Sequence, residues 1–210
     1  MIKILNLYAG IGGNRRLWPD DEIEVTAVEL NPKIAKIYQD FFPNDKVIVA
    51  DAHDYLLKNF QKFDFIWSSP PCPSHSRIRI HSAVARGQNE ALFPDLKLYE
   101  EILFLKGYFK GKWVVENVIS WYKPLIKPYT YQEHYYWSNF IIDGKKKATR
   151  CHNEGIVALQ KLKGFDLSNY KLSIEYPKEK VLRNCVEPGA GLFIFNSAFK
   201  EQQTQLNKIV

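Results

Sequence analysis

The chain has 210 residues, of which 46% are hydrophobic and 25% are charged, as is typical of a globular protein with one sizeable core. No uncharged run approaches the roughly 20 residues of a membrane span, and the first residues lack the pattern of a signal peptide, so we expect a cytoplasmic protein with no membrane partner. The three cysteines are widely spaced and odd in number, which excludes a disulfide framework and a four-ligand zinc site.

The formal net charge of +6 is unevenly distributed. Residues 1–60 hold 7 Lys and Arg against 9 Asp and Glu, a net charge of −2. Residues 61–210 hold 22 against 14, a net charge of +8. This asymmetry indicates that a polyanion such as nucleic acid contacts the later part of the chain.

A first strand is predicted over residues 2–8, and Gly10, Gly12 and Gly13 follow it directly. Glycines at this place let the backbone approach a ligand closely and turn into a helix. The spacing differs from the full dinucleotide-binding fingerprint, so the turn predicts a ligand site only together with the strands that follow.

A second strand is predicted over residues 24–28 and ends at Glu29, near where a nucleotide-binding fold places the acid that binds a ribose. Asn31 and Pro32 predict the cap and first turn of a helix over residues 32–42.

A third strand is predicted over residues 46–50 and is closed by Asp51. The first three predicted strands end in a glycine turn, in Glu29 and in Asp51. For an adenosine, these ends supply a backbone that can be approached closely, an acceptor for a hydroxyl group and an acceptor for an amine. The alternative is that both acids only cap the helices that follow them. His53 is expected to be an ordinary surface residue.

The apolar run at residues 63–68 predicts a buried fourth strand that stops at Pro70 and Pro71. Cys72 follows at the carboxyl end, where open α/β sheets bind ligands. Prolines on both sides of Cys72 restrict the backbone, so we expect a stiff loop that presents a reactive thiol. The alternative is a buried structural cysteine.

An amphipathic helix is predicted over residues 92–108, and a fifth strand over residues 113–115 runs into Glu116. The sequence therefore predicts a fixed thiol and a fixed carboxylate at neighbouring strand ends. The predicted apolar face of the helix holds Leu96, Tyr99, Ile102 and Leu103.

The alternation of predicted strands and helices becomes less clear after the fifth strand. Residues 131–142 are aromatic and β-like, residues 143–150 include a basic turn, and residues 151–180 show no clear motif. A closing helix is predicted over residues 190–206. No metal site is expected.

Six short motifs occur in the order and spacing of one family. They are residues 7–13, residues 29–32, Asp51, residues 70–72, residues 116–118 and residues 184–186. Along nearly its whole length the chain resembles the DNA cytosine-5 methyltransferase family, as a small member with a much reduced target-recognition region.

The resemblance implies an α/β, Rossmann-like methyltransferase fold, with a mostly parallel sheet, helices on both faces, S-adenosylmethionine as the cofactor and DNA as the partner. It implies a single domain over residues 1–210, in which residues 143–180 form the reduced recognition region and residues 181–206 return to the cofactor site.

The resemblance also assigns residues to the cofactor and to the substrate. The turn holds the methionine part, Glu29 binds the ribose hydroxyls, Leu30 packs on the adenine, and Asp51 accepts from its amine. The cofactor-binding set is Tyr8, Ala9, Gly10, Ile11, Gly12, Gly13, Glu29, Leu30, Asp51, Ala52, Pro71 and Asn184. The DNA-contacting set is Ser74, Ser76, Arg77, Arg79, Asn117, His134, Lys145, Lys146 and Lys147.

The catalytic residues implied are Cys72 and Glu116. A Cys72 thiolate adds to C6 of a flipped-out cytosine while Glu116 hydrogen-bonds N3. C5 then takes up the methyl group, and loss of the C5 proton with elimination frees the cysteine. A charged carboxylate beside the thiol is expected to raise the pKa of Cys72.

The chain departs from the family in two places. Where members carry paired arginines, residues 132–139 offer only His134. Only 44 residues separate Asn139 from Asn184, too few for the usual recognition region. Specificity is therefore relaxed, or resides in the loop after Cys72 and the basic turn, or comes from a partner such as a specificity subunit.

Three alternatives remain open. An exocyclic-amine methyltransferase has a similar Pro-Pro tetrapeptide, but with an aromatic residue where Cys72 stands. A tRNA cytosine-5 methyltransferase carries the same Pro-Pro-Cys motif. A non-catalytic nucleic-acid-binding subunit would keep the fold. A bacterial or phage restriction-modification system, with a cognate nuclease, is the expected setting.

Overall fold

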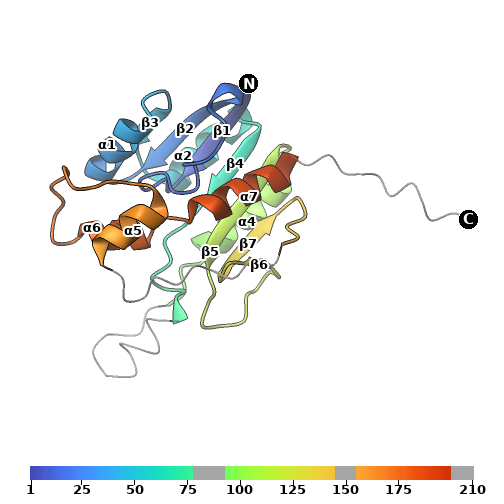
Figure 1. Cartoon of the computed structure of the whole chain (residues 1–210). Coiled ribbons are helices and arrows are strands. Elements are labelled where there is room, and N and C mark those ends of the chain that lie inside the picture. Colours follow the sequence, from blue (N-terminus) through green and yellow to red (C-terminus); the bar gives the residue numbers. More distant parts are fainter. Residues whose placement is uncertain (78–92, 145–154, 200–210) are drawn as a thin grey trace, which may run out of the picture.

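A computed structural model describes residues 1–77, 93–144 and 155–199 of the chain (Figure 1). These residues form a seven-stranded sheet in the order β3-β2-β1-β4-β5-β7-β6. The first five strands in this order are parallel, β7 is antiparallel to β5, and β6 is antiparallel to β7. The strands are β1 (Ile2–Leu7), β2 (Ile23–Glu29), β3 (Lys46–Val49), β4 (Phe65–Ser68), β5 (Lys112–Val118), β6 (Tyr129–Tyr131) and β7 (His134–Ser138). The expected Rossmann-like methyltransferase fold is therefore confirmed.

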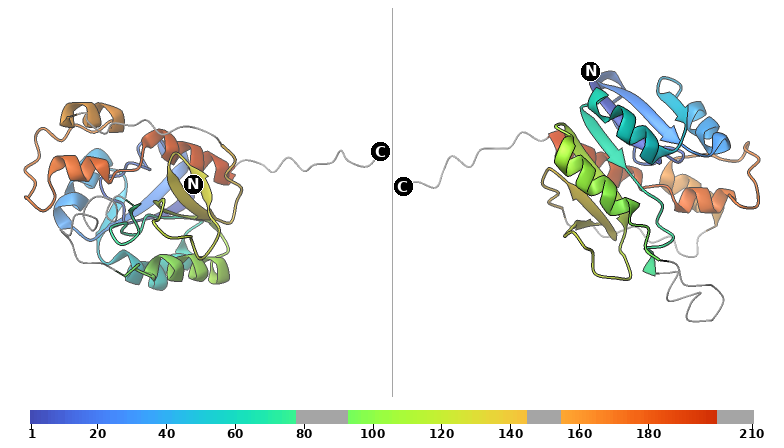
Figure 2. Two further views of the ribbon diagram at one scale, coloured as in Figure 1. Left: turned by 90° about the horizontal axis from the view of Figure 1, so that it is seen from below. Right: turned by 180° about the vertical axis from the view of Figure 1, so that it is seen from behind.

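Helices cover both faces of this sheet (Figure 2), as the sequence predicts. In the described ranges they are α1 (Pro32–Phe41), α2 (Ala52–Asn59), α4 (Lys97–Tyr108), α5 (Ile156–Lys163), α6 (Lys178–Arg183) and α7 (Pro188–Phe199), with short 3-10 helices at Asp20–Glu22 and Phe60–Lys62. None of these helices combines the length and the apolar character that crossing a bilayer requires.

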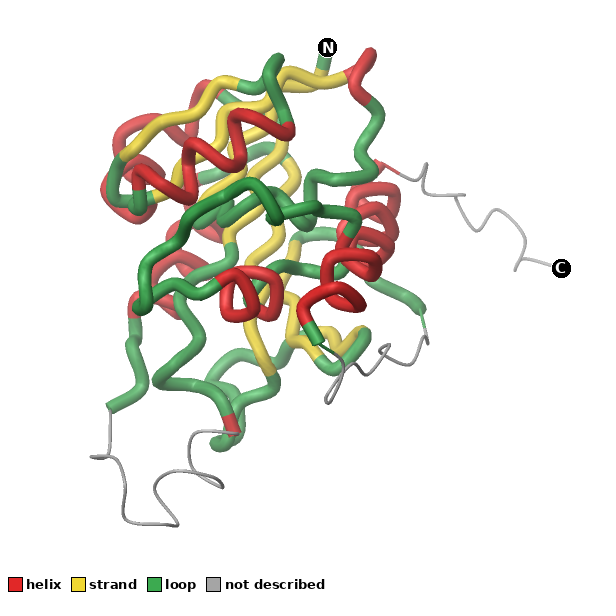
Figure 3. The backbone as a smooth tube through the Cα atoms, turned by 60° about the vertical axis from the view of Figure 1, so that its left-hand side comes forward, coloured by secondary structure: helices red, strands yellow, loops and turns green. Residues whose placement is uncertain are grey.

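Apolar clusters cover both faces of the sheet because neighbouring residues of a strand point to opposite faces, and a third cluster joins α1 to α5 and α6. Ile4 and Trp67 pack on one face with α7, whereas Leu5 and Ile66 pack on the other face with α2 and α4. The tube in Figure 3 shows the strands running between these helices. All four residues of β4 are buried, as expected for a central parallel strand. This burial fixes the strand that leads to Cys72.

Local signals predicted the first half of the fold correctly. Asn31 caps α1, because its side chain accepts hydrogen bonds from the backbone N–H groups of Lys33 and Ile34, and Pro32 is the first helical residue. The five parallel strands occur where the apolar runs predict them.

The expected helix after the glycine turn is absent, because this segment is held by side chains from elsewhere. A Cβ atom on Gly13 would lie 2.2 Å from Cys185 Sγ, so no side chain fits there. Asn14 Nδ2 donates to Asn6 Oδ1 at 2.8 Å. The next residue, Arg15, is buried. The described residues 13–18 form turns instead of a helix.

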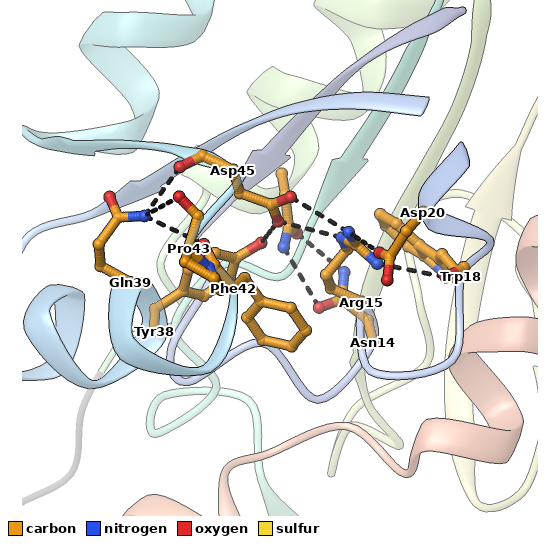
Figure 4. A network of polar contacts seen from close by, with 10 residues as sticks. Asn14, Arg15, Trp18, Asp20, Tyr38, Gln39, Phe42, Pro43 and Asp45 are labelled. Carbon is orange, nitrogen blue, oxygen red and sulfur yellow. Dashed lines mark hydrogen bonds and ion pairs between the residues drawn. The ribbon is translucent and has the colours of Figure 1, made fainter. Parts of the chain in front are cut away.

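Arg15 belongs to a buried polar network (Figure 4). Its guanidinium donates to both carboxylate oxygens of Asp45, from Nε at 3.0 Å and from Nη2 at 3.1 Å. Tyr38 donates to the same carboxylate at 2.8 Å, and Arg15 also pairs with the exposed Asp20. The network joins the segment after the glycine turn to α1 and to the start of β3.

The predicted apolar face of the fourth helix is wrong in part. α4 begins at Lys97, and its buried residues are Leu98, Tyr99, Glu101, Ile102 and Leu105. Leu96 and Leu103 are 54% and 59% exposed. The buried face therefore includes a charged residue, Glu101, which the apolar pattern does not predict.

The later part of the chain differs from the sequence prediction in detail. The β-like residues 131–142 contribute to a hairpin, β6 and β7, that turns at Gln132 and Glu133. α5 lies in the stretch without a motif, and α7 begins at Pro188 instead of residue 190. The basic turn, from residue 145 on, and residues 200–206 of the predicted closing helix lie outside the described residues.

Candidate active site

The glycine turn leaves space beside its backbone at the carboxyl end of β1. Tyr8, Gly10 and Gly12 have positive φ angles of 54°, 55° and 87°. The N–H of Ala9 donates to the carbonyl of Val28 at 3.0 Å, which ties the turn to β2. A Cβ atom built on Gly10 meets no atom within 4 Å, so a ligand can approach the backbone here. Ile11 is buried beneath the turn.

Glu29 lies against this turn, as the sequence predicts for a ribose-binding acid. Its Oε2 accepts from the N–H of Gly10 at 3.0 Å, and its Oε1 accepts from the N–H of Asn31 at 2.9 Å. Burial raises the pKa of Glu29, and these N–H groups oppose that rise. Glu29 therefore holds the turn and the start of α1 and is not the cap of that helix.

Two further residues of the predicted adenosine site border the same strand ends. Leu30 is 66% exposed, unusual for a leucine beside a buried strand and suited to packing on a flat ring. Asp51 is exposed and caps α2 through the N–H of Asp54, with Ala52 buried behind it. Open backbone, a held carboxylate and an exposed apolar side chain together fit a nucleoside cofactor.

The loop that carries Cys72 is held by hydrogen bonds at both ends. Asn117 Nδ2 donates to the carbonyl of Pro70 at 2.9 Å. The N–H groups of His75 and Ser76 both donate to the carbonyl of Cys72 at 3.0 Å. Cys72 itself is half-buried. The structure therefore presents the thiol on an ordered loop.

Glu116 lies inside β5, not beyond its end as the sequence predicts. The strand continues to Val118 because Glu116 pairs with Tyr136 across the antiparallel β7. The side chain of Glu116 is largely buried, and His134 Nε2 lies 3.7 Å from its Oε1. His134 Nδ1 lies 3.1 Å from the carbonyl of Gln132, so a proton on Nδ1 makes that hydrogen bond and leaves Nε2 facing the carboxylate.

The thiol and the carboxylate influence each other electrostatically. Burial raises the pKa of the Cys72 thiol, and the negative charge of Glu116 raises it further. The sequence predicts this effect from the two motifs alone. The pairing of β4 with β5, and the hydrogen bond from Asn117 to Pro70, place the Cys72 loop beside the strand that carries Glu116.

Replacing Glu116 by glutamine is expected to make Cys72 more reactive toward iodoacetamide. The change removes a negative charge, so the thiol pKa falls and more thiolate is present at any pH below it. We expect alkylation at pH 8 to be roughly two- to fivefold faster, measured by mass spectrometry of the peptide that carries Cys72. Glu24→Gln, on the exposed side of β2, makes the same charge change elsewhere and is the control. Equal rates in the two variants would mean that burial alone raises the thiol pKa.

The predicted DNA-contacting residues are only partly described. Ser74 Oγ accepts from the N–H of Asp95, and Ser76 forms an isolated bridge with Ser120, so both hold the loop after Cys72. Asn117 is buried and also holds that loop, whereas Arg77 is exposed. The remaining candidates, Arg79, Lys145, Lys146 and Lys147, lie outside the described residues.

The C-terminal motif returns to the glycine turn. Cys185 Sγ and the carbonyl of Val186 both lie where a Cβ atom on Gly13 would be. Burial raises the pKa of Cys185 to about 12, so this thiol serves packing. The neighbouring Asn184 is exposed, and Pro71, predicted to line the same site, is exposed at the Cys72 loop.

Sequence reasoning missed Glu101 and misjudged His53. Glu101 is fully buried, and His53 Nδ1 lies 3.1 Å from it with 14% of the histidine side chain exposed. The prediction of an ordinary surface histidine is therefore wrong. A signal for Glu101 exists, since it occupies the same helix face as Leu98, Ile102 and Leu105. No group of three or more metal-ligating side chains occurs in the described ranges.

Comparisons with known proteins show which family this chain resembles in sequence. The family model "C-5 cytosine-specific DNA methylase" matches residues 2–107. A tRNA (cytosine(38)-C(5))-methyltransferase from Homo sapiens is 25% identical over 122 residues, covering 56% of this chain and 30% of the relative. The enzyme of the same name from Spodoptera frugiperda is 31% identical over 80 residues, covering 36% and 24%. The chain thus spans less than a third of the length of these curated relatives.

Solved structures with similar folds include methyltransferases. A crystal structure of a Spodoptera frugiperda DNMT2 mutant has a TM-score of 0.39 at 25% identity, covering 56% of this chain and 36% of that one. A SAM-dependent methyltransferase from Agrobacterium tumefaciens has a TM-score of 0.40 at 17% identity, covering 58% and 40%. The family model matches half of the chain, over the glycine turn, Glu29, Asp51 and the Cys72 loop. The chain therefore belongs to the C-5 cytosine-specific DNA methylase family, and its cofactor is S-adenosylmethionine.

Proposed function

We propose that this protein methylates C5 of cytosine in DNA. The observation that carries the proposal is the attachment of the Cys72 loop to β5, where Asn117, next to Glu116, donates to the carbonyl of Pro70 at 2.9 Å. In this arrangement the charge of Glu116 raises the pKa of the Cys72 thiol. A nucleophile after β4 and a proton-handling group on the neighbouring β5 are what addition to a pyrimidine ring needs. The family match covers the cysteine but ends before Glu116, so this geometry is support independent of it.

The residues have distinct roles in the proposed reaction. S-adenosylmethionine supplies an electrophilic methyl group when bound. The Cys72 thiolate adds to C6 and pushes an electron pair toward N3, where Glu116 in its protonated form donates a hydrogen bond. This makes C5 nucleophilic enough to take up the methyl group. A base then removes the C5 proton, and the returning electron pair expels Cys72 as a thiolate.

The electrostatics of the site suit substrate-dependent activation of the thiol. With Glu116 ionised and no substrate bound, the thiol pKa is raised, so Cys72 stays protonated and unreactive. When Glu116 shares a proton with cytosine N3, its repulsion on the thiol falls. His134, 3.7 Å from Glu116, is proposed to assist in place of the family's arginine.

The cofactor assignments rest on the turn and its neighbours. We propose that Glu29 accepts from the ribose, that Leu30 packs on the adenine and that Asp51 accepts from its amine. Support comes from the held carboxylate of Glu29, from the exposure of Leu30 and from the open space beside Gly10.

The substrate base must be flipped out of a duplex before C6 is reachable, at a cost of a few kcal/mol. We propose that Arg77, Arg79 and Lys145 to Lys147 meet the phosphates, in line with the positive charge of residues 61–210. A specificity subunit or another partner would supply target recognition that the short C-terminal region lacks. A cognate restriction nuclease is the proposed biological counterpart.

A tRNA substrate is the second candidate function. It is favoured by the two curated relatives, whose names specify cytosine 38 of tRNA. Both candidates use the same thiol chemistry, because the cytosine ring is the same in DNA and in RNA. They differ only in the nucleic acid that brings the base to Cys72.

The test is nucleoside mass spectrometry after incubation with methyl-labelled S-adenosylmethionine and either unmethylated DNA or unmodified tRNA. Labelled 5-methylcytosine from DNA is the expected result. Label only in tRNA would move the substrate to the second candidate, and label on an exocyclic nitrogen would overturn the C5 chemistry. Cofactor binding with no label in either nucleic acid would favour a non-catalytic subunit.

A further inference from the structure

Glu101 is a fully buried carboxylate at the centre of a set of hydrogen bonds. It lies on the buried face of α4, with 0% of its surface exposed. A buried carboxylate is costly unless hydrogen bonds satisfy it. Its environment must therefore supply donors, and the segments that supply them are held to it.

Three donors come from three different segments. The hydroxyl of Tyr8 donates to Oε1 of Glu101 at 2.6 Å, and the hydroxyl of Ser68 donates to Oε2 at 2.6 Å. His53 Nδ1 lies 3.1 Å from Oε1. These residues belong to the glycine turn, the end of β4 and α2. One side chain thus joins the turn to the strand that leads to Cys72.

The contact with Tyr8 bears on the shape of the turn. Tyr8 has a φ angle of 54°, a left-handed conformation that a side chain rarely adopts. Such a residue persists only where its surroundings hold it. The turn is held at one end by Glu101 through Tyr8 and at the other by Glu29 through the N–H of Gly10.

The hydrogen bond between Tyr8 and Glu101 has a fixed direction. Burial raises the pKa of Tyr8, and the charge of Glu101 raises it further. The phenol therefore keeps its proton and acts as the donor throughout the working pH range. A hydrogen bond to an ionised acceptor is roughly twice as strong as one between neutral groups. The charge of Glu101 therefore strengthens the contact that fixes Tyr8 and the glycine turn.

We infer that Glu101 is a positioning residue for the cofactor site, acting through Tyr8 to hold the glycine turn in its binding conformation. The inference deepens the proposed function, since it takes the turn as the place where the methionine part binds. Glu101 is not a catalytic residue, because it has no exposed atom with which to touch a ligand. Its effect is expected on cofactor affinity, with turnover at saturating cofactor largely kept.

The test is calorimetric binding of S-adenosylhomocysteine to four variants of the full chain. Glu101→Gln keeps the shape and removes the charge, and Tyr8→Phe removes only the donor. Each is expected to raise the Kd about tenfold. The double variant is expected to be no weaker than the worse single variant, because both changes act on the one hydrogen bond between Tyr8 and residue 101. Glu24→Gln, on the exposed side of β2, makes the same charge change outside this network and is expected to bind within about twofold of the parent.

The outcomes separate this inference from the proposed function. A Kd unchanged in Glu101→Gln and Tyr8→Phe, with the parent binding normally, would overturn the inference alone. Multiplying effects in the double variant would overturn the route through Tyr8. A parent chain that fails to bind S-adenosylhomocysteine would instead contradict the proposed cofactor site. In activity assays, a raised KM for the cofactor with a kept kcat is expected, whereas a residue with a merely structural role would lower the melting temperature without this split.

Discussion

Replacing Cys72 by alanine is expected to lower the rate of methyl transfer by at least about a thousandfold, because the change removes the nucleophile proposed to form the bond to C6. The loop should keep its shape, since it is held by backbone contacts of Pro70, His75 and Ser76 that do not use the thiol. The measurement is incorporation of methyl label into DNA under single-turnover conditions, beside the parent chain.

Two controls make this result specific to covalent chemistry. S-adenosylhomocysteine should bind the alanine variant within about twofold of the parent, which shows that the fold is intact. DNA that carries 5-fluorocytosine should trap the parent in a stable adduct, because fluorine at C5 cannot leave as a proton does. The alanine variant should form no adduct. Methyl transfer that survives in the variant would contradict the proposed role of Cys72.

Replacing Asp45 by alanine is expected to reduce the free energy of unfolding by about 3 kcal/mol, because it leaves the Arg15 charge buried with one partner removed. Both oxygens of Asp45 accept from Arg15, and one also accepts from Tyr38. Asp20 remains as a partner of Arg15, but it is exposed. Denaturation in urea, followed by circular dichroism, measures the change.

Asp40→Ala is the matched control for this stability measurement. Asp40 forms an ion pair with Lys36 on the exposed surface of α1, and solvent screens such pairs. We expect its midpoint of denaturation to stay close to that of the parent. If both variants shift the midpoint equally, the buried network contributes no more than a surface pair.

Local sequence signals predicted the strands and α1 because these elements depend on residues close in the chain. Asn31 caps α1 through N–H groups two and three residues away. The helix expected after the glycine turn failed for the opposite reason. Gly13 packs on Cys185, and Arg15 pairs with Asp45, and no local pattern reports partners that lie so far along the chain.

The candidate site likewise has one part that the sequence predicts and one part that it does not. Cys72 and Glu116 could be predicted to meet because parallel strands bring their carboxyl ends to one edge of a sheet. The role of Glu101 could not be predicted from the sequence, since the residues that hydrogen-bond to its carboxylate are residues 8, 53 and 68. A charged residue on an apolar helix face was the visible signal, and only the three-dimensional arrangement shows what satisfies it.

The hairpin between β6 and β7 turns through two residues whose backbone is strained. Gln132 and Glu133 adopt φ angles of 48° and 63°, where tight turns favour asparagine or glycine. Among the residues that the structure describes, neither polar atom of the buried Gln132 side chain has a hydrogen-bond partner. An Asn-Gly pair at these positions would relieve the backbone strain and is expected to give a variant with a higher free energy of unfolding. The strained turn therefore stands directly before His134, the residue whose ring faces Glu116.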